Sequence, residues 1–262
     1  MTAKDWSPEI YARFRGLRLR PAMDLLAQLP DLPDGPIIDL GCGSGAVGPA
    51  LKARFPKRRL FGVDQSPTML EEAEATGCYY RLTQMDLADW QPEEPPAAIF
   101  SNAVLNWLPD HPLLVPHLAQ ALMPGGALAL QMPKQQEAPS HALLRSLSAE
   151  IFPDRFDWSN WRDTVHDGAE YLAWLQDFGP VTIWETEFYQ ILAPQSLAHP
   201  VRVFTQSTAA RRVLDQLTEV EAARFFTAYD AALEQAYPPR SDGSVVMQFR
   251  RLFVLLHKSA EI

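Results

Sequence analysis

The sequence predicts an α/β domain built on a mostly parallel sheet whose last strand is antiparallel. Short apolar runs alternate with helical stretches from residue 36 to about residue 137, and such alternation is typical of strand–helix–strand units that pair in parallel. Two longer apolar runs follow, at 181–192 and at 244–258, with a helical segment between them. We expect these two runs to form an antiparallel edge that carries a helical lid.

The elements of the first half are predicted from apolar runs and from residues typical of helix ends. Ser66 followed by Pro67 indicates the start of a helix, and the Gly125-Gly126 pair indicates a stop before a strand. Strands are expected at 36–40, 60–63, 80–85, 97–100 and 127–132, with helices at 46–55, 67–76 and 112–122.

Helical segments are expected on both sides of this alternating core. Residues 1–30 form a predicted N-terminal helical cover, in which Pro21 should end one helix before a second begins. A turn-rich segment at 31–36 links the cover to the sheet. After residue 138 we expect a helix at 138–151 and the helical lid at about 194–237. We expect residues 1–262 to form one domain.

Composition excludes several classes of protein. The chain has 262 residues and a net charge of −9, whereas nucleic-acid binders usually present a basic face to phosphates. The first residues lack the apolar core of a secretory signal, and no run of about 18 apolar residues predicts a membrane span. The two cysteines, Cys42 and Cys78, are expected to be free thiols. We therefore expect a cytoplasmic protein, monomeric or weakly dimeric, that binds neither nucleic acid nor membrane.

A glycine-rich turn follows the first predicted strand. The run Asp39-Leu-Gly-Cys-Gly-Ser-Gly45 leads from a strand into a helix, and ligands of open α/β sheets bind beyond such strand ends. Glycines there let the backbone approach a ligand closely. The turn alone is compatible with a methyltransferase site, with a dinucleotide site, or with an ordinary glycine turn. Gly41, Gly43 and Ala46 fit the relaxed dinucleotide pattern.

Polar side chains at the next strand ends favour the methyltransferase interpretation. Asp64 ends the second strand, where a carboxylate can accept bonds from both ribose hydroxyls. Asp86 follows the third strand and can accept from an adenine amino group. Asn102 follows the fourth strand. A dinucleotide enzyme does not need polar groups of this form at the third and fourth strand ends.

These motifs resemble those of class I S-adenosylmethionine-dependent methyltransferases, and more narrowly those of the trans-aconitate 2-methyltransferase family. The narrower likeness rests on segments spread over nearly the whole chain, namely Trp6-Ser-Pro-x-x-Tyr11-x-x-Phe14, Arg18-Leu-Arg-Pro-Ala22, Asn102-Ala-Val-Leu-Asn-Trp-Leu-Pro-Asp-His111, Pro116-His-Leu118, Gln131-Met-Pro133, Pro153-Asp-Arg155, Trp184 and Arg251-Leu-Phe253. The sequence departs from the family mostly in the second half, at Lys134-Gln135, Glu187, Gln190, Ala209-Ala210 and Arg250.

The resemblance implies a Rossmann-like sheet, S-adenosyl-L-methionine as cofactor, no metal, and a small carboxylic acid as substrate. It divides the chain into a cofactor-binding half at 36–137 and an acceptor-side half at 138–262. The residues expected at the cofactor are Asp39, Gly41, Gly43, Gly45, Asp64, Gln65, Asp86, Leu87 and Asn102. Those expected at the acceptor are Arg251, Arg211, Arg20, Trp107 and Tyr11.

The acceptor-side residues have alternative interpretations. Trp107 is either a core residue or a wall beside the cofactor sulfonium. Arginines would clamp carboxylates that are not methylated, and Arg251 is preferred because one of two neighbouring strand residues must face inward. His111 is expected in a loop and His117 on an outward helix face, so neither is the expected base. Since a carboxylate acceptor is already ionised at neutral pH, it needs none.

The predicted reaction is esterification of a carboxylate of a small polycarboxylic acid. Two alternatives stay open. One is a methyltransferase of the same fold with another acceptor, such as a malonyl thioester carboxyl. The other is a cofactor-binding subunit without catalytic activity.

Overall fold

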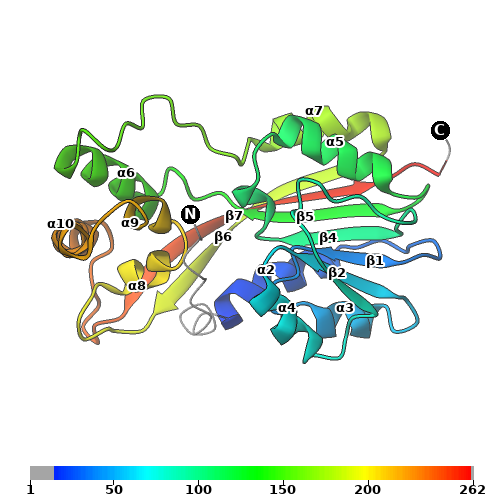
Figure 1. The fold of residues 1–262 in the computed structure, drawn as a ribbon, viewed down its shortest axis with the longest axis horizontal. Helices are drawn as coiled ribbons and strands as arrows, with labels where there is room; N and C mark the ends of the chain where they lie inside the picture. The colour runs from blue at the N-terminus through cyan, green and yellow to red at the C-terminus, as the bar shows by residue number, and fades with distance from the viewer. Residues whose placement is uncertain (1–14, 261–262) are drawn as a thin grey trace. The chain divides into compact units, whose positions relative to one another are not determined.

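The computed structural model describes residues 15–260, and within them seven strands form one sheet in the order β3-β2-β1-β4-β5-β7-β6 (Figure 1). The parallel part pairs β3 with β2, β2 with β1, β1 with β4 and β4 with β5. Strand β7 is antiparallel to β5, so the predicted class is confirmed. The strands are β1 (Ile37–Leu40), β2 (Leu60–Asp64), β3 (Arg81–Gln84), β4 (Ala98–Asn102), β5 (Ala127–Pro133), β6 (Val181–Leu192) and β7 (Val245–His257).

Nearly every predicted helix is present, and the lid segment contains three helices with connections between them. The helices are α2 (Arg15–Ala27), α3 (Gly48–Arg54), α4 (Pro67–Glu74), α5 (His111–Ala121), α6 (Pro139–Ile151), α7 (Gly168–Leu175), α8 (Pro200–Gln206), α9 (Arg211–Leu214) and α10 (Glu219–Ala236), with short 3-10 turns η1 (Leu105–Trp107) and η2 (Gln176–Phe178). None of the helices within residues 15–260 is both long and apolar enough to cross a bilayer. Helix α7 was not predicted.

The prediction that Pro21 ends a helix is wrong. Helix α2 runs through Pro21 from Arg15 to Ala27. Proline removes one helical hydrogen bond, but Ala22 and Leu25 of the same helix are completely buried. Burial of this apolar face therefore outweighs the local preference of the proline.

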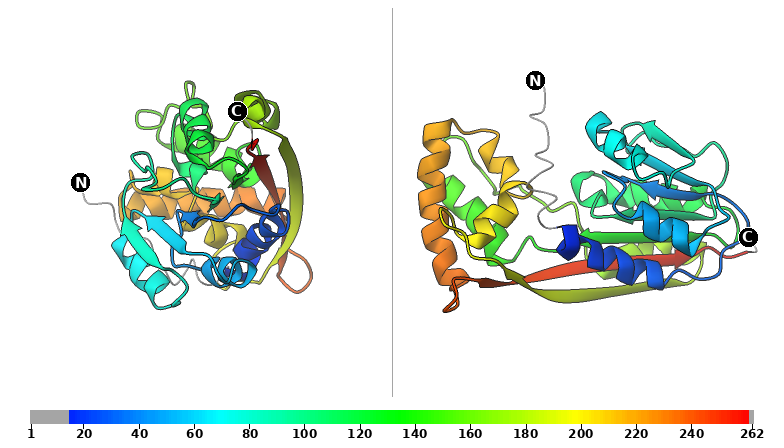
Figure 2. Two further views of the ribbon diagram at one scale, coloured as in Figure 1. Left: turned by 90° about the vertical axis from the view of Figure 1, so that its right-hand side faces the viewer. Right: turned by 90° about the horizontal axis from the view of Figure 1, so that it is seen from below.

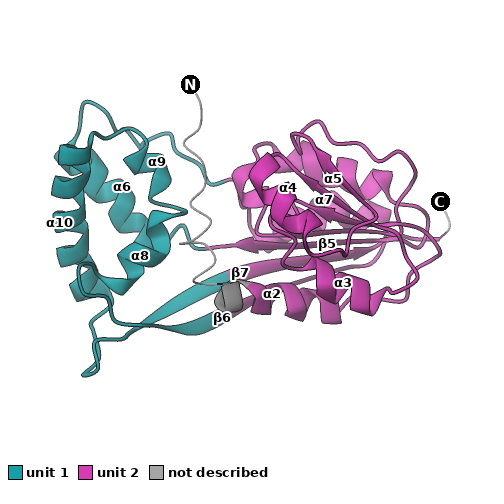
Figure 3. Cartoon of the chain, turned by 60° about the horizontal axis from the view of Figure 1, so that its bottom comes forward, with its two compact units in different colours: residues 1–17, 135–163, 187–250 teal, residues 18–134, 164–186, 251–262 magenta. Residues whose placement is uncertain are grey.

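The chain divides into two compact units (Figure 3). Unit 1 comprises residues 1–17, 135–163 and 187–250, and unit 2 comprises residues 18–134, 164–186 and 251–262. Unit 2 holds the parallel strands, with α5 and α7 over one face and α2, α3 and α4 over the other (Figures 1 and 2). Strands β1 and β5 are almost fully buried, as expected for parallel strands covered on both faces.

Unit 1 packs α6, α8 and α9 around the long helix α10. Phe225, Tyr229 and Leu233 are fully buried and lie one turn apart on the same face of α10. The Tyr229 hydroxyl donates to the carbonyl of Ser140 at 2.6 Å, which ties α10 to α6. The helix starts at a capping box formed by Thr218 and Glu221.

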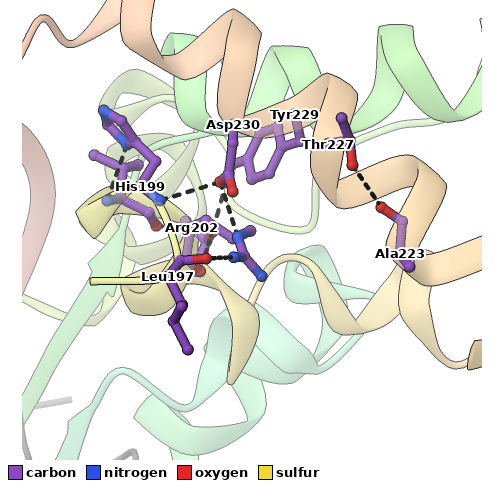
Figure 4. Close-up of polar contacts among 9 residues, drawn as sticks. Leu197, His199, Arg202, Ala223, Thr227, Tyr229 and Asp230 are labelled. Atoms are coloured by element: carbon purple, nitrogen blue, oxygen red, sulfur yellow. Dashed lines mark hydrogen bonds and ion pairs between the residues drawn. The ribbon is translucent and has the colours of Figure 1, made fainter. Parts of the chain in front are cut away.

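A polar cluster in the same unit joins α8 to α10 (Figure 4). The Asp230 carboxylate on α10 accepts from Arg202 Nε at 2.8 Å and from the His199 amide at 3.3 Å. Arg202 also donates to the Leu197 carbonyl at 3.0 Å. The two charged side chains are mostly buried, with 13% and 26% of their surface exposed, so water screens this pair less than it screens a surface pair.

Replacing Asp230 with alanine is expected to lower the free energy of unfolding by about 1.5–3 kcal/mol, because the change leaves a charged donor without its acceptor. Thr227→Ala is the matched control, since Thr227 lies less than one turn away, is exposed, and donates from its hydroxyl to the Ala223 carbonyl of its own helix. We expect this control to change stability by less than about 0.5 kcal/mol. Urea unfolding of both variants checks the prediction, and equal losses would contradict it.

Candidate active site

The carboxyl ends of the five parallel strands lie at one edge of unit 2. In the parallel register Leu40 pairs with Val63, Asp64 with Gln84, and Asn102 with Gln131. The segments that leave these ends carry the residues predicted to bind the cofactor, so the structure brings the predicted set to one edge. Ligands of open α/β sheets bind at such an edge, near the point where the strand order reverses, which here is between β1 and β4.

The glycine turn after β1 depends on backbone conformations that L side chains rarely adopt. Gly41, Gly43 and Gly45 have φ angles of 76°, 51° and 73°. A Cβ atom at Gly41 would lie 2.4 Å from the Val104 side chain, whereas one at Gly43 would meet nothing within 4 Å. Gly41 is therefore required by packing, and Gly43 faces open space at the edge of the sheet.

The Asp64 carboxylate fixes this turn to the neighbouring strand. One carboxylate oxygen accepts from the Gly43 amide at 2.9 Å, and the other accepts from the Ser66 amide at 2.9 Å. Ser66 in turn caps α4 through its hydroxyl. Each carboxylate oxygen can accept a second hydrogen bond, so Asp64 retains acceptor capacity toward a ligand.

Asp39 lies on β1 immediately before the turn and is almost completely buried. Burial raises the pKa of this carboxyl to about 7, a hydrogen bond from Tyr79 opposes the rise, and the nearby charge of Asp64 adds to it. The Tyr79 hydroxyl donates to Asp39 at 2.6 Å. Sequence reasoning missed Tyr79. Its only signal is that Gly45, Gly48 and Gly62 leave room for its ring.

The remaining predicted cofactor residues differ in exposure. Gln65 and Asp86 are exposed, and Asp86 accepts from the Ala88 amide at 3.0 Å. Leu87 is buried. The Oδ1 atom of Asn102 is buried and has no hydrogen-bond partner among residues 15–260. A buried acceptor of this kind costs about 1–3 kcal/mol if it stays unsatisfied, so a donor from a ligand or from water is expected there.

Arg251 shares the edge of the sheet with these residues. It pairs in register with Pro133 at the carboxyl end of β5 and is 2% exposed. Its guanidinium donates to Gln131 at 3.3 Å, and Gln131 pairs with Asn102 on β4. The chain thus places a buried cation at the same edge on β7, with β4 and β5 between it and β1.

The other predicted acceptor residues that the structure describes belong to three different elements. Trp107 is 42% exposed in η1, just after β4. Arg20 is an exposed residue of α2 and pairs with Asp24 of its own helix at 2.7 Å. Arg211 belongs to α9 of unit 1, where its Nε lies 3.7 Å from Asp215. Tyr11 lies outside the described residues, as do the other motif residues before position 15.

His111 is not a loop residue as predicted, because it is the first residue of α5 and is completely buried. One ring nitrogen lies 2.8 Å from the Leu105 carbonyl, which can only accept, and the other lies 2.6 Å from the Tyr171 hydroxyl. Burial lowers the pKa of His111. Both nitrogens are thus engaged, one with η1 and the other with α7, while His117 is exposed as predicted.

No cluster of three or more histidine, cysteine, aspartate or glutamate side chains that could hold a metal ion occurs in the part of the chain that the structure describes. The groups available at the edge are carboxylates, backbone amides, amides of Asn102 and Gln131, and one guanidinium. This set suits a nucleoside and an organic acid.

Comparison with known proteins agrees with this geometry. Residues 11–182 match the methyltransferase domain family. Trans-aconitate 2-methyltransferase of Methylobacterium nodulans is 40% identical over 97% of this chain and 99% of its own length, and that of Escherichia coli O17:K52:H18 is 37% identical with the same coverage.

Solved structures share the fold at low identity. YcgJ of Bacillus subtilis has a TM-score of 0.55 at 14% identity, covering 95% of this chain and 99% of that one. Phosphoethanolamine N-methyltransferase 2 of Haemonchus contortus, solved with S-adenosyl-L-methionine, has a TM-score of 0.52 at 13% identity, covering 92% and 53%. The chain belongs to the S-adenosylmethionine-dependent methyltransferases and, within them, to the trans-aconitate 2-methyltransferase family.

Proposed function

We propose that the protein transfers a methyl group from S-adenosylmethionine to a carboxylate of a small polycarboxylic acid, with trans-aconitate, the compound in the names of its relatives, as the first candidate. The observation that carries the proposal is the edge of unit 2, where an open glycine turn and a buried arginine occur together. The turn suits a nucleoside cofactor, and the arginine suits an acid.

The residues at this edge fit S-adenosylmethionine. Gly43 leaves open space where a side chain would obstruct a ligand. Asp64 retains acceptor capacity for ribose hydroxyls, Asp86 is exposed for an adenine amino group, and the buried Oδ1 of Asn102 needs a donor. We assign Asp39, Gly41, Gly45, Gln65 and Leu87 to the same site as its framework. When bound, the cofactor supplies a methyl group activated by a sulfonium.

The acceptor residues orient the acid and need not remove a proton from it. A carboxylate has a reference pKa of about 4 and is ionised at neutral pH. Arg251 would hold a carboxylate that is not methylated through two parallel hydrogen bonds. Trp107 would form an apolar wall, and Arg211 and Tyr11 stay separate candidates for binding the acid. Arg20 is the weakest candidate because Asp24 already binds it. Most of the rate enhancement would then come from positioning.

The proposal also covers the cellular compartment and the oligomeric state of the enzyme. Cys42 and Cys78 are both free thiols, which suits the reducing cytoplasm. We propose a monomer or weak homodimer there.

The assignment of the substrate is tested by offering methyl-labelled cofactor with a panel of small di- and tricarboxylic acids and a malonyl thioester. Transfer of label to none of these compounds would favour a non-catalytic subunit. Label on the thioester alone would favour the alternative acceptor.

Two glycine variants are expected to distinguish effects on cofactor affinity from effects on the stability of the fold. Gly43→Ala places a methyl group in the open space, so we expect the affinity for S-adenosylmethionine to fall about tenfold or more, with a loss of stability of about 1–2 kcal/mol from the φ angle alone. Gly41→Ala adds a clash with Val104 and should destabilise the fold more. Calorimetric titration and thermal unfolding measure both effects. Wild-type affinity in Gly43→Ala would contradict the assignment.

Arg251→Lys keeps the positive charge but loses the planar fork. We expect kcat/KM for the acid to fall about 10- to 100-fold, in line with loss of about 1.5–3 kcal/mol of charge-assisted bonding. The affinity for the cofactor should be unchanged. Arg250→Lys is the control, because this neighbouring side chain is 55% exposed, and it should keep full activity. If Arg251→Lys retains full activity on every acid that the wild type methylates, Arg251 is not the residue that holds the acid.

The dependence of kcat on pH distinguishes a carboxylate acceptor from a hydroxyl. With saturating cofactor and acid, we expect kcat to be nearly constant between about pH 6 and 8, because the acceptor is fully ionised well above its pKa of about 4. The product should be a methyl ester that dilute base hydrolyses. A steep rise of kcat through neutral pH would instead require a general base and an acceptor with a proton to lose.

A further inference from the structure

We infer that Tyr79 is a positioning residue of the cofactor site, which fixes the Asp39 carboxylate and the glycine turn for the binding of a cationic cofactor. The inference rests on the proposed function of this turn. Tyr79 lies in the connection between α4 and β3, far in sequence from the turn. It belongs to unit 2, as do all residues that it contacts below.

The ring of Tyr79 packs against the backbone of three glycines. A Cβ atom would lie 3.1 Å from the ring at Gly45, 2.9 Å at Gly48 and 2.9 Å at Gly62. Real Cβ atoms essentially never approach another heavy atom within 3.0 Å. A side chain at Gly48 would therefore displace the ring, and one at Gly62 would displace both the ring and Leu82, whose Cδ2 would lie at 2.5 Å. The three positions belong to the turn, to the start of α3 and to β2. The ring thus packs against three segments of unit 2 while its hydroxyl binds Asp39.

The hydroxyl completes the arrangement through one short hydrogen bond. It donates to Asp39 Oδ2 at 2.6 Å, across 40 residues of sequence. Burial and the neighbouring Asp39 carboxylate strongly raise the pKa of the Tyr79 hydroxyl. The hydroxyl therefore keeps its proton throughout the range in which proteins fold, and stays a donor to the carboxylate.

The charge state of Asp39 depends on what surrounds it. Asp64, from β2, carries a like charge that raises the pKa of Asp39, and burial raises it further. Cys42, in the turn, stays a neutral thiol because burial and the two aspartates raise its pKa. Cys78 adjoins Tyr79 and contributes to the raised pKa of its hydroxyl. Among these neighbours, the Tyr79 hydroxyl alone is a hydrogen-bond donor to the carboxylate that favours its charged form.

This arrangement couples cofactor binding to pH. S-adenosylmethionine carries a sulfonium and an ammonium group, so an ionised Asp39 beside the turn attracts it and a protonated Asp39 does not. The pKa of Asp39 is about 7. The affinity should therefore fall as pH drops through neutrality, and removal of the Tyr79 hydroxyl should move this fall to higher pH.

Tyr79→Phe tests the inference because it keeps the ring against the glycines and removes only the hydroxyl. Tyr80→Phe is the matched control, since its neighbouring ring is 67% exposed and lies outside this network. The affinity for S-adenosylmethionine is measured by calorimetry from about pH 6.5 to about pH 9, and each variant is compared with the wild type at the same pH. Titration of the cofactor amino group, near pH 8, then affects all three proteins equally.

The expected result is a several-fold weaker affinity of Tyr79→Phe at about pH 6.5, which converges toward that of the wild type by about pH 9. Tyr80→Phe should match the wild type throughout. A Tyr79→Phe affinity equal to the wild type at every pH would overturn the inference. So would a loss of equal size at every pH, because that pattern would mean only a packing role.

A second measurement separates this inference from the proposed function. In the cofactor-free protein, the carboxyl stretching band of Asp39 can be followed by infrared titration and identified by its absence in Asp39→Asn. We expect its midpoint to rise in Tyr79→Phe and to stay unchanged in Tyr80→Phe. If the wild type does not bind S-adenosylmethionine, the proposed function fails while this titration still tests the contact. An unchanged midpoint in Tyr79→Phe overturns the inference alone.

Discussion

The Asp64 carboxylate holds together the part of the molecule on which the site depends. It lies at the end of β2 and accepts backbone hydrogen bonds from Gly43 in the turn and from Ser66 at the start of α4. The glycines of the turn have left-handed φ angles and lose more entropy on folding than other residues do. The Val63 carbonyl accepts from the Gly41 and Cys42 amides, and Asp64 adds the bond to Gly43. An acceptor fixed on a buried strand therefore determines where the open space at Gly43 lies.

This arrangement disfavours the ionised form of Asp39, because Asp39 is buried and the like charge of Asp64 is near it. Like charges near each other disfavour ionisation, and burial disfavours it further. Because the pKa of Asp39 in the folded chain is above its value of 3.8 in water, ionisation of this group opposes folding as pH rises toward 7. A cationic ligand offsets that penalty, which agrees with a site built for a sulfonium cofactor.

Many residues of this edge could be predicted from the sequence, because they belong to short local motifs. The glycine run, Asp64 and Asn102 each follow an apolar strand, and parallel strands bring their carboxyl ends to one edge. The contact of Tyr79 with Asp39 was not predictable, since nothing local in the sequence pairs a tyrosine with three distant glycines. Likewise, the buried face of α2 overrides Pro21, and the environment of His111 depends on Tyr171 of a helix that was not predicted.

The central claim is that the turn at Gly43 and the Asp64 carboxylate bind the cofactor. A crystal structure of the full chain with S-adenosylhomocysteine tests it most directly. The account predicts the amino-acid part of the ligand against Gly43, the ribose hydroxyls on Asp64 and the adenine beside Asp86. A ligand bound elsewhere, or bound at the turn with its ribose away from Asp64, would contradict it.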